Sequence, residues 1–240
     1  MIGKRKILIS NDDGIFADGL LRLAEAAKEY GEVWIVAPDS QRSATSHAIS
    51  LHRGIEGWAV DHPVEGVRAY ACTGTPADCI RIGVRNIVPG GPDLVLCGIN
   101  HGYNAGTDLQ YSATVGAAME AAFQKLPVIA FSEEAVDLHE VTDHYLKEIL
   151  EKLMDQPLSP NEIWNVNFPG CPLAECRGVL YDRRVSEDVF YDDSYTETPL
   201  ENGRVLYRVE GSRRWDALEG TDLRAVLDGF VSVGKAKNIS

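Results

Sequence analysis

The sequence of 240 residues predicts an α/β protein with a mostly parallel, doubly wound sheet. Short apolar runs end in turn-forming residues, and in the segments between them apolar residues recur at helical spacing. Residues 7–10 predict a buried strand, and residues 20–27 predict a helix that ends at Gly31. Residues 33–37 predict the next strand, which completes a βαβ unit with a right-handed crossover. Because strands and helices continue to alternate, we expect a Rossmann-like sheet with helices on both faces.

The same alternation continues through the first two thirds of the chain. Thr75, Pro76 and Asp78 supply an N-cap, a proline at the first helical position and an acid in the first turn. They predict a helix that runs to about Val84. The other strands are predicted at residues 67–72, 94–97, 128–131 and 163–168, the other helices at residues 112–124 and 141–154, and loops at residues 41–50 and 100–107.

The pattern changes after Pro169. Residues 179–202 are acidic and aromatic without helical periodicity, and residues 205–209 predict a strand, so we expect an extended hairpin or arm. A short helix at residues 222–227 and a strand at residues 230–233 follow. The expected division is a Rossmann-like core at residues 1–178, an arm at 179–215, and a C-terminal helix and strand at 216–240 that return to the core.

Four aromatic side chains lie in the expected arm: Tyr181, Phe190, Tyr191 and Tyr195. Aromatic side chains on an exposed arm are costly unless something covers them, and a second subunit is the usual cover. We therefore expect a homodimer, or a higher homo-oligomer, that buries the arm.

Composition and charge exclude several classes of protein. A formal net charge of -13 makes the chain a poor partner for polymeric nucleic acid, which requires a basic face. No apolar run approaches the ~20 residues needed to cross a bilayer, and the apolar stretch at residues 7–9 is too short for a secretory signal. The five cysteines contain no Cys-x-x-Cys pair, which disfavours a zinc site and favours a reducing compartment. We expect a cytoplasmic protein with no membrane partner.

A pair of adjacent carboxylates follows the first predicted strand directly, in the segment Asn11-Asp12-Asp13-Gly14. In open α/β sheets, ligands bind beyond the carboxyl ends of the strands. Adjacent carboxylates repel each other, and a cation or solvent relieves this repulsion. The alternative interpretation is an Asx turn that precedes the next helix.

Two further loops at the same predicted edge carry oxygen donors. Asp39 and Ser43 follow the second strand, and Asn100 and Asn104 follow the strand at residues 94–97. Carboxylate, hydroxyl and amide oxygens suit a hard ion such as Mg²⁺, Mn²⁺ or Ca²⁺ better than zinc. The three loops together favour one divalent metal ion at this edge.

With these segments in view, the chain resembles the stationary-phase survival protein SurE family of metal-dependent nucleotidases. The matching segments are Ser10-Asn11-Asp12-Asp13-Gly14, Ala37-Pro38-Asp39, Arg42-Ser43-Ala44-Thr45, Thr73-Gly74-Thr75-Pro76-Ala77-Asp78-Cys79, Gly98-Ile99-Asn100 and Ser112-Ala113-Thr114-Val115, with a weaker match at Gly229-Phe230-Val231-Ser232-Val233. The resemblance implies a 5'- and 3'-nucleotidase that acts on nucleoside monophosphates. It also implies metal ligands at Asp12, Asp13, Ser43 and Asn100, and a C-terminal extension used in dimerisation.

The chain departs from the family pattern at two places. Ala113 stands where the family commonly has glycine, which adds a methyl group near the expected phosphate. Residues 234–240 lack the Thr-Pro-Leu ending that commonly follows the last strand. The first departure bears on substrate fit and the second on the oligomer.

The candidate catalytic residues are Asp12, Asp13 and Asn100, and the expected nucleophile is a water activated by the ion. The candidate substrate- or phosphate-binding residues are Asn11, Ser43, Asn104, Ser112 and Thr114. Ser112 and Thr114 stand where a helix begins, so they could hold phosphate, cap the helix, or do both. Asn104, in a glycine-rich loop, either binds phosphate or adopts a left-handed turn. His47 and His101 adjoin the site, but solvent or structural roles are favoured for both.

Other phosphatase and nucleotide motifs fit the chain poorly. A haloacid-dehalogenase-type phosphatase requires Asp-x-Asp after its first strand, and here the nucleophile position is Asn11, whose amide cannot form an acyl phosphate. The dinucleotide-binding Gly-x-Gly-x-x-Gly and the P-loop motif are absent from the sequence. A non-catalytic, metal-dependent nucleotide sensor that uses the same edge remains the alternative from another class.

Overall fold

The computed structural model describes residues 4–238, and a nine-stranded sheet forms its centre. The strands of this sheet are β1 (Lys6–Ser10), β2 (Glu32–Pro38), β3 (Gly57–Val60), β4 (Arg68–Cys72), β5 (Leu94–His101), β6 (Val128–Glu133), β7 (Glu162–Phe168), β8 (Val179–Arg183) and β11 (Val231–Lys237). Their spatial order is β3-β4-β2-β1-β5-β6-β7-β11-β8. The helices are α1 (Asp18–Ala27), α2 (Pro76–Ile82), α3 (Ala113–Phe123), α4 (Glu140–Leu153) and α5 (Asp222–Leu227).

The central strands of the sheet run parallel. All neighbouring pairs from β4 through β2, β1, β5 and β6 to β7 are parallel, whereas β3 and β11 join the sheet antiparallel to β4 and β7. The predicted α/β fold class with a mostly parallel sheet is therefore confirmed. Parallel order also brings the ends of β1, β2, β5 and β6 to a common edge, which is where the candidate site lies.

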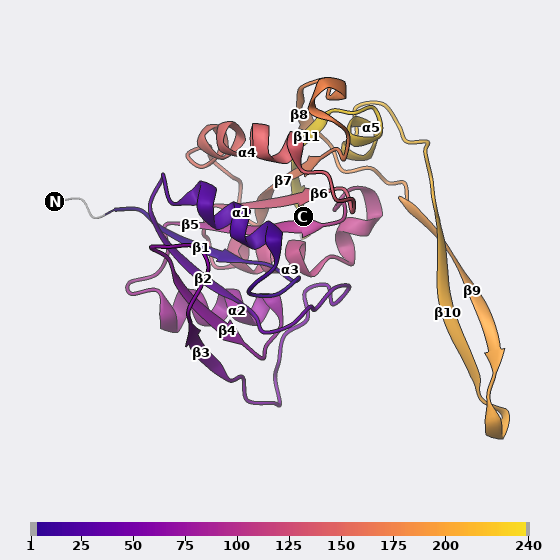
Figure 1. Ribbon diagram of the computed structural model, residues 1–240, viewed down its shortest axis with the longest axis horizontal. Helices are drawn as coiled ribbons and strands as arrows, with labels where there is room; N and C mark the ends of the chain where they lie inside the picture. The colour runs from indigo at the N-terminus through magenta and orange to yellow at the C-terminus, as the bar shows by residue number, and fades with distance from the viewer. Residues whose placement is uncertain (1–3, 239–240) are drawn as a thin grey trace.

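Helices cover both faces of the sheet, with α1 and α4 on one face and α2 and α3 on the other (Figure 1). Strand β1 shows why helices must cover both faces of the sheet. Ile7 and Ile9 belong to the buried cluster that includes α1 and α4, whereas Leu8 belongs to the cluster under α2 and α3. Side chains alternate between the faces of a strand, so a strand that is apolar at every position is buried on both sides.

The local signals at the start of α2 act as the sequence predicts. The Thr75 hydroxyl accepts a hydrogen bond from the Asp78 backbone N–H at 3.1 Å, and the Asp78 carboxylate accepts one from the Thr75 N–H at 3.0 Å. This capping box satisfies two backbone donors at the helix start. Within residues 4–238, no helix is both long enough and apolar enough to cross a membrane.

The arm is a two-stranded antiparallel hairpin of β9 (Tyr191–Pro199) and β10 (Val205–Arg213) that projects away from the body (Figure 1). It begins later than the sequence indicated. Residues 179–183, expected in the arm, form β8 and pair in parallel with β11 at the end of the main sheet. The sequence also did not predict β3, and it ended the strands β5 and β11 too early.

Two of the four aromatic residues expected on the arm lie in the body instead. Phe190 is buried with Leu223 and Val226 of α5, and Tyr181 packs beneath the Lys152 ammonium group. Only Tyr191 and Tyr195 lie on the hairpin itself. A sequence without periodicity does not reveal which aromatic side chain returns to the core, because that depends on the contacts of β8 and α5.

Candidate active site

Asn11 forms the turn that follows β1. Its side-chain nitrogen donates to the Gly14 carbonyl at 2.9 Å, and its side-chain oxygen accepts from the Gly14 N–H at 3.3 Å. Gly14 has a φ of +108°, a conformation that side chains rarely adopt. Because Asn11 is fully buried and both ends of its amide serve the turn, it shapes the loop. These bonds agree with the Asx-turn interpretation for this residue, while a phosphate contact by Asn11 stays a prediction.

Asp12 lies in the floor of the site with 2% of its surface exposed. Thr114, near the start of α3, donates its hydroxyl hydrogen to Asp12 Oδ1 at 2.5 Å. The Asp12 carbonyl accepts from the Arg42 N–H at 2.7 Å, which fixes the loop after β2 against the turn after β1. Burial raises the pKa of Asp12 to about 6; the Thr114 hydrogen bond lowers the pKa, and the neighbouring Asp13 raises it.

Asp13 points towards the loops that follow β2 and β5. Its Oδ2 accepts from the His101 backbone N–H at 3.2 Å, and its Oδ1 accepts from the Gln41 side-chain nitrogen at 3.2 Å. Burial raises the pKa of Asp13, while the His101 N–H lowers it. Two adjacent, largely desolvated carboxylates are an unfavourable arrangement that a bound cation would relieve.

Asn100, at the end of β5, completes the centre of the site. Its side-chain nitrogen donates to the Gly102 carbonyl at 2.8 Å, so its oxygen turns towards the Thr114 hydroxyl, 3.5 Å away. The position of β5 depends on the start of α1. A Cβ atom on Gly19 would approach the Ile99 carbonyl oxygen to 2.1 Å, so only glycine allows this helix and strand to meet.

The side chain of Gln41 connects Ser43 to Asp13. One nitrogen of Gln41 contacts both Ser43 Oγ, at 3.0 Å, and Asp13 Oδ1. The structure thus brings together the four predicted metal ligands Asp12, Asp13, Ser43 and Asn100, with Thr114 and Gln41 linking them. Sequence reasoning missed Gln41, although its position in the loop that carries Ser43 was a usable signal.

The remaining phosphate candidates have structural partners. Ser112 caps α3 by accepting from the Val115 N–H at 3.1 Å, and this capping is compatible with a phosphate contact. Asn104 is buried, and its side-chain nitrogen donates to Ser132 Oγ at 2.7 Å. The Asn104 backbone N–H donates to the side-chain oxygen of Asn167 at 2.8 Å. The left-handed turn is wrong for Asn104, since this residue is not among those with positive φ. Phosphate binding by Asn104 stays a prediction.

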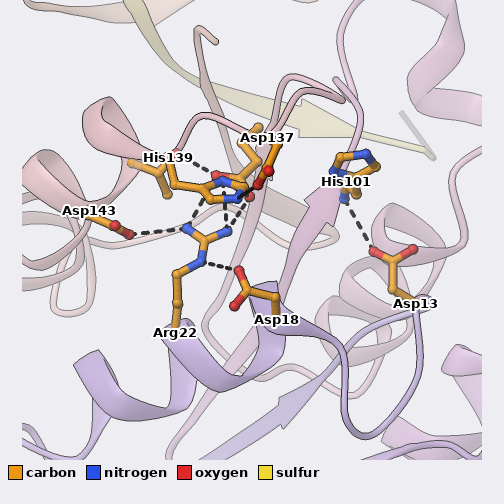
Figure 2. A network of polar contacts seen from close by, with 9 residues as sticks. Asp13, Asp18, Arg22, His101, Asp137, His139 and Asp143 are labelled. Atoms are coloured by element: carbon orange, nitrogen blue, oxygen red, sulfur yellow. Dashed lines mark hydrogen bonds and ion pairs between the residues drawn. The ribbon is translucent and has the colours of Figure 1, made fainter. Parts of the chain in front are cut away.

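Sequence reasoning also missed an ion network beside the site (Figure 2). Arg22 of α1 forms an ion pair with the buried Glu133 at the end of β6, and it contacts Asp18 at 2.7 Å and Asp143 at 3.2 Å. His139 Nδ1 lies 3.1 Å from the same Glu133 carboxylate. The spacing of Asp18 and Arg22 on one helix indicates an ion pair, but only the fold reveals Glu133 as the shared partner.

The donor set fits a hard divalent ion. Among residues 4–238 there is no group of three or more His, Cys, Asp or Glu side chains with metal-binding geometry. The expected ligands include only two carboxylates, however, and a hydroxyl and an amide supply the other oxygens. Oxygen-only ligands with two carboxylates are typical of Mg²⁺, Mn²⁺ and Ca²⁺ sites. Burial raises the pKa of both Asp12 and Asp13, and a bound cation would favour their charged forms.

The fold and the site together define a Rossmann-like α/β protein with an oxygen-rich site at the carboxyl edge of its sheet. The family model described as Survival protein SurE matches residues 7–189. This chain belongs to the SurE family.

Individual relatives agree with this assignment over nearly the whole chain. The protein named 5'-nucleotidase SurE from Trichodesmium erythraeum is 43% identical and covers 95% of this chain and 90% of its own. That of Caldanaerobacter subterraneus subsp. tengcongensis is 38% identical, over 97% of this chain and 91% of its own. The crystal structure of the SurE protein from Aquifex aeolicus superimposes with a TM-score of 0.81 at 33% identity, over 97% and 93% of the two chains.

Proposed function

We propose that this chain is a divalent-metal-dependent nucleotidase that removes phosphate from nucleoside 5'- and 3'-monophosphates. The proposal rests on one observation: the four candidate ligands lie together at one edge of the sheet, and hydrogen bonds of Thr114 and Gln41 link them. These ligands are Asp12, Asp13, Ser43 and Asn100. The relatives named 5'-nucleotidase support the 5' activity. The 3' activity and the metal requirement rest on the family resemblance and on the chemistry of the donors.

The residues that would hold the ion are Asp12, Asp13, Ser43 and Asn100. When bound, the ion offsets the negative charge of the phosphate and lowers the pKa of the attacking water. Positioning of the ligands and contacts to the phosphate are the roles of the protein's own groups. Thr114 keeps Asp12 in place by donating to it, so Thr114 is a positioning residue. The start of α3, capped by Ser112, offers backbone N–H groups near the reacting phosphate.

The expected nucleophile is water, since each candidate protein nucleophile has another role. Burial raises the pKa of the Cys97 thiol well above its ordinary value, so it is not a thiolate at neutral pH. Asn11 is an amide, and Ser43 is assigned as a ligand. A single displacement by water inverts the configuration at phosphorus, whereas a phosphoenzyme gives net retention. Hydrolysis of a chiral, isotopically labelled thiophosphate ester distinguishes the two, and retention would contradict the proposed roles.

The direct test is phosphate release from AMP and GMP with and without Mn²⁺. The nucleotidase proposal expects release that depends on the ion and that EDTA removes reversibly. A non-catalytic nucleotide sensor, the alternative from another class, would bind AMP in the presence of Mn²⁺ without releasing phosphate. The same assay with 3'-AMP tests the 3' activity.

Two further parts of the proposal concern the assembly and the location of the protein. We propose a homodimer, or a higher homo-oligomer, through the hairpin of β9 and β10. Tyr195, Tyr207 and Val209 support it, because all three are largely exposed on this hairpin. A cytoplasmic location is proposed because the five cysteines, all among the described residues, form no disulfide, which fits a reducing compartment. Nucleoside monophosphates are the proposed substrates, and polymeric nucleic acid is not a proposed partner.

A further inference from the structure

A cavity of about 730 Å³ lies at the edge of the sheet opposite to the candidate active site. Arg5, Asp93, Pro127 and Glu162 line it, and each lies at or next to the start of a parallel strand. The ends of α3 and α4 and the segments that follow them form the rest of its wall. Among the described residues, its lining includes none of the candidate metal or phosphate ligands. The volume falls within the ~300–1,000 Å³ typical of small-molecule sites.

Much of the wall of this cavity is apolar and rigid. It contains four half-buried apolar residues, Phe123, Leu126, Met154 and Leu158. It also contains three prolines, whose rings fix the backbone φ, at Pro127, Pro157 and Pro160. The segment between α4 and β7 is held at two points: the Ser159 N–H donates to the Glu162 carboxylate at 2.9 Å, and the Lys235 ammonium group donates to the Pro157 carbonyl at 3.3 Å. A pre-formed wall lowers the cost of ordering a bound molecule.

The charged groups of the wall compensate one another. Arg5 forms an ion pair with Asp155, and Glu162 forms one with Lys235 at 3.3 Å. The two other charged residues of the lining, Asp93 and Lys125, have opposite signs. A charged ligand would therefore lose its hydration in this cavity without gaining a matching field, whereas an uncharged apolar ligand gains from burial alone.

The polar groups of the wall narrow the class of ligand. Gln156, Ser159 and Asn161 add amide and hydroxyl groups to the lining. Such groups donate and accept hydrogen bonds without carrying charge. A flat heteroaromatic ring system fits both features, because its faces are apolar while the nitrogen and oxygen atoms at its edge form hydrogen bonds.

The cavity is connected to the candidate active site through α3. Phe123, near the end of this helix, lines the cavity and stacks on the His47 ring with 5.3 Å between the ring centroids. His47 lies on the loop that carries Ser43. Thr114, near the start of the same helix, donates to Asp12. A ligand that fixes the Phe123 ring therefore restricts the loop and the helix that hold two of the proposed metal ligands.

We propose that this cavity is an effector site for an uncharged, planar heteroaromatic molecule, and that binding there strengthens Mn²⁺ binding at the opposite edge of the sheet. The position and the ligand class depend on the cavity alone, whereas the effect on Mn²⁺ rests on the proposed metal-dependent function. The coupling is reciprocal, so Mn²⁺ strengthens binding of the effector by the same factor.

Caffeine is the probe for the site, because it is an uncharged, planar heteroaromatic molecule without ribose or phosphate. Calorimetry with the full chain should give a Kd below about 1 mM. Met154→Arg places a long cationic side chain in the cavity at the end of α4, where a helix tolerates a cation, and should weaken binding at least about tenfold. Leu218→Arg is the matched control, since Leu218 is an exposed apolar residue outside the cavity, and it should bind caffeine as the wild type does.

Two-dimensional NMR of the wild type locates the site without any variant, so it decides the position even if Met154→Arg does not fold. Caffeine should shift the backbone signals of residues 122–126 and 154–159. No binding at millimolar caffeine, equal affinity in the wild type and a folded Met154→Arg protein, or shifts confined to residues 11–14 and 100–104 would overturn the site. Shifts that follow the protein concentration instead of caffeine would mean that a second copy of the chain covers this face, and would overturn it as well.

The coupling is tested by calorimetry with Mn²⁺. Saturating caffeine should tighten Mn²⁺ binding to the wild type about fivefold. Phe123→Leu keeps an apolar wall but removes the ring that stacks on His47, so this variant should lose the effect when it is saturated with caffeine. An unchanged Mn²⁺ affinity in the wild type, or the same fivefold effect in Phe123→Leu, would overturn the coupling. Failure of the proposed function would appear separately, as absent Mn²⁺ binding without caffeine or absent phosphate release from AMP.

Discussion

Thr114 donates its hydroxyl hydrogen to Asp12 across 102 positions of the chain, so a residue expected to contact phosphate also holds a predicted metal ligand in place. Gln41 plays a similar part for Asp13 and Ser43. The residue types at this edge are predictable from sequence, because turns after parallel strands gather there. Which of these side chains contact each other is not predictable from sequence. A hydroxyl group at the start of a helix can cap the helix, bind phosphate or donate a hydrogen bond to a carboxylate equally well.

The first prediction concerns the two carboxylates. Asp12→Asn and Asp13→Asn should each lower kcat/KM for AMP by at least about 100-fold, because each removes a charged ligand of the ion. The melting temperature of the metal-free protein should not fall, since either change removes repulsion between adjacent carboxylates. Activity assays and thermal unfolding check both parts, with Asp61→Asn, an exposed acid, as the control. Full activity of metal-stripped wild-type protein, verified by elemental analysis, would contradict the metal requirement.

The second prediction concerns Asp222, a buried carboxylate at the start of α5. It accepts hydrogen bonds from the backbone N–H groups of Ser186 at 2.8 Å and Gly106 at 3.2 Å. Burial raises its pKa to about 6, from an ordinary value of 3.8, so the folded state binds a proton more tightly than the unfolded state. The resulting stability is present below about pH 4 and is lost as the pH rises through about 6.

An Asp222→Asn variant isolates this effect, because asparagine keeps an acceptor but does not titrate. The free energy of unfolding of the wild type, minus that of the variant, should fall by up to about 3 kcal/mol between pH 4 and pH 7. Urea unfolding at several pH values measures the difference. A constant difference across this range would show that the Asp222 pKa is not raised.

At the scale of elements, the sequence predicted the helices and strands whose characteristic residues lie within the element itself. The capping box of α2, the boundaries of α5 and the apolar strands β1 and β2 were all recognisable. By contrast, β8 was assigned to the arm and β3 was missed. Both are end strands of the sheet without a buried position, so they lack the apolar pattern that reveals a strand between two helix layers.

The third prediction concerns the packing of the loop that carries Ser43 onto α3. A Cβ atom on Gly116 would approach the Ser46 carbonyl oxygen to 2.3 Å, and His47 Nε2 lies 2.9 Å from the buried Glu120 of the same helix. Gly116→Ala should therefore displace the loop and weaken Mn²⁺ binding about tenfold, even though alanine favours the helix itself. Calorimetry measures the affinity. Gly54→Ala, where the added Cβ meets no atom within 4 Å, is the control, and unchanged affinity in both variants would contradict the role of this contact.

At the scale of the whole molecule, the body and the hairpin have opposite character. The body buries a continuous apolar core on both faces of its sheet, whereas the strands of the hairpin are exposed along almost their whole length. Tyr195 lies opposite Val209 in the hairpin, and Tyr207 is two residues from Val209, so these three side chains share one face. An isolated two-stranded hairpin is at best marginally stable in water, so we expect a partner to cover it.

The last prediction follows from this one-sided apolar face. A second copy of the chain is the simplest cover, because two identical hairpins can bury the same face in a symmetric contact. Light scattering at micromolar concentration should show a homodimer, and Tyr195→Lys combined with Val209→Lys should weaken dimerisation at least about 30-fold, since aromatic residues at the centre of an interface often contribute 2 kcal/mol or more. Thr196→Lys, on the opposite face of β9, tests whether charge alone disturbs the hairpin and should leave the dimer intact. A wild-type monomer with full activity would mean that the exposed face serves another partner or none, and that the site is complete within one chain.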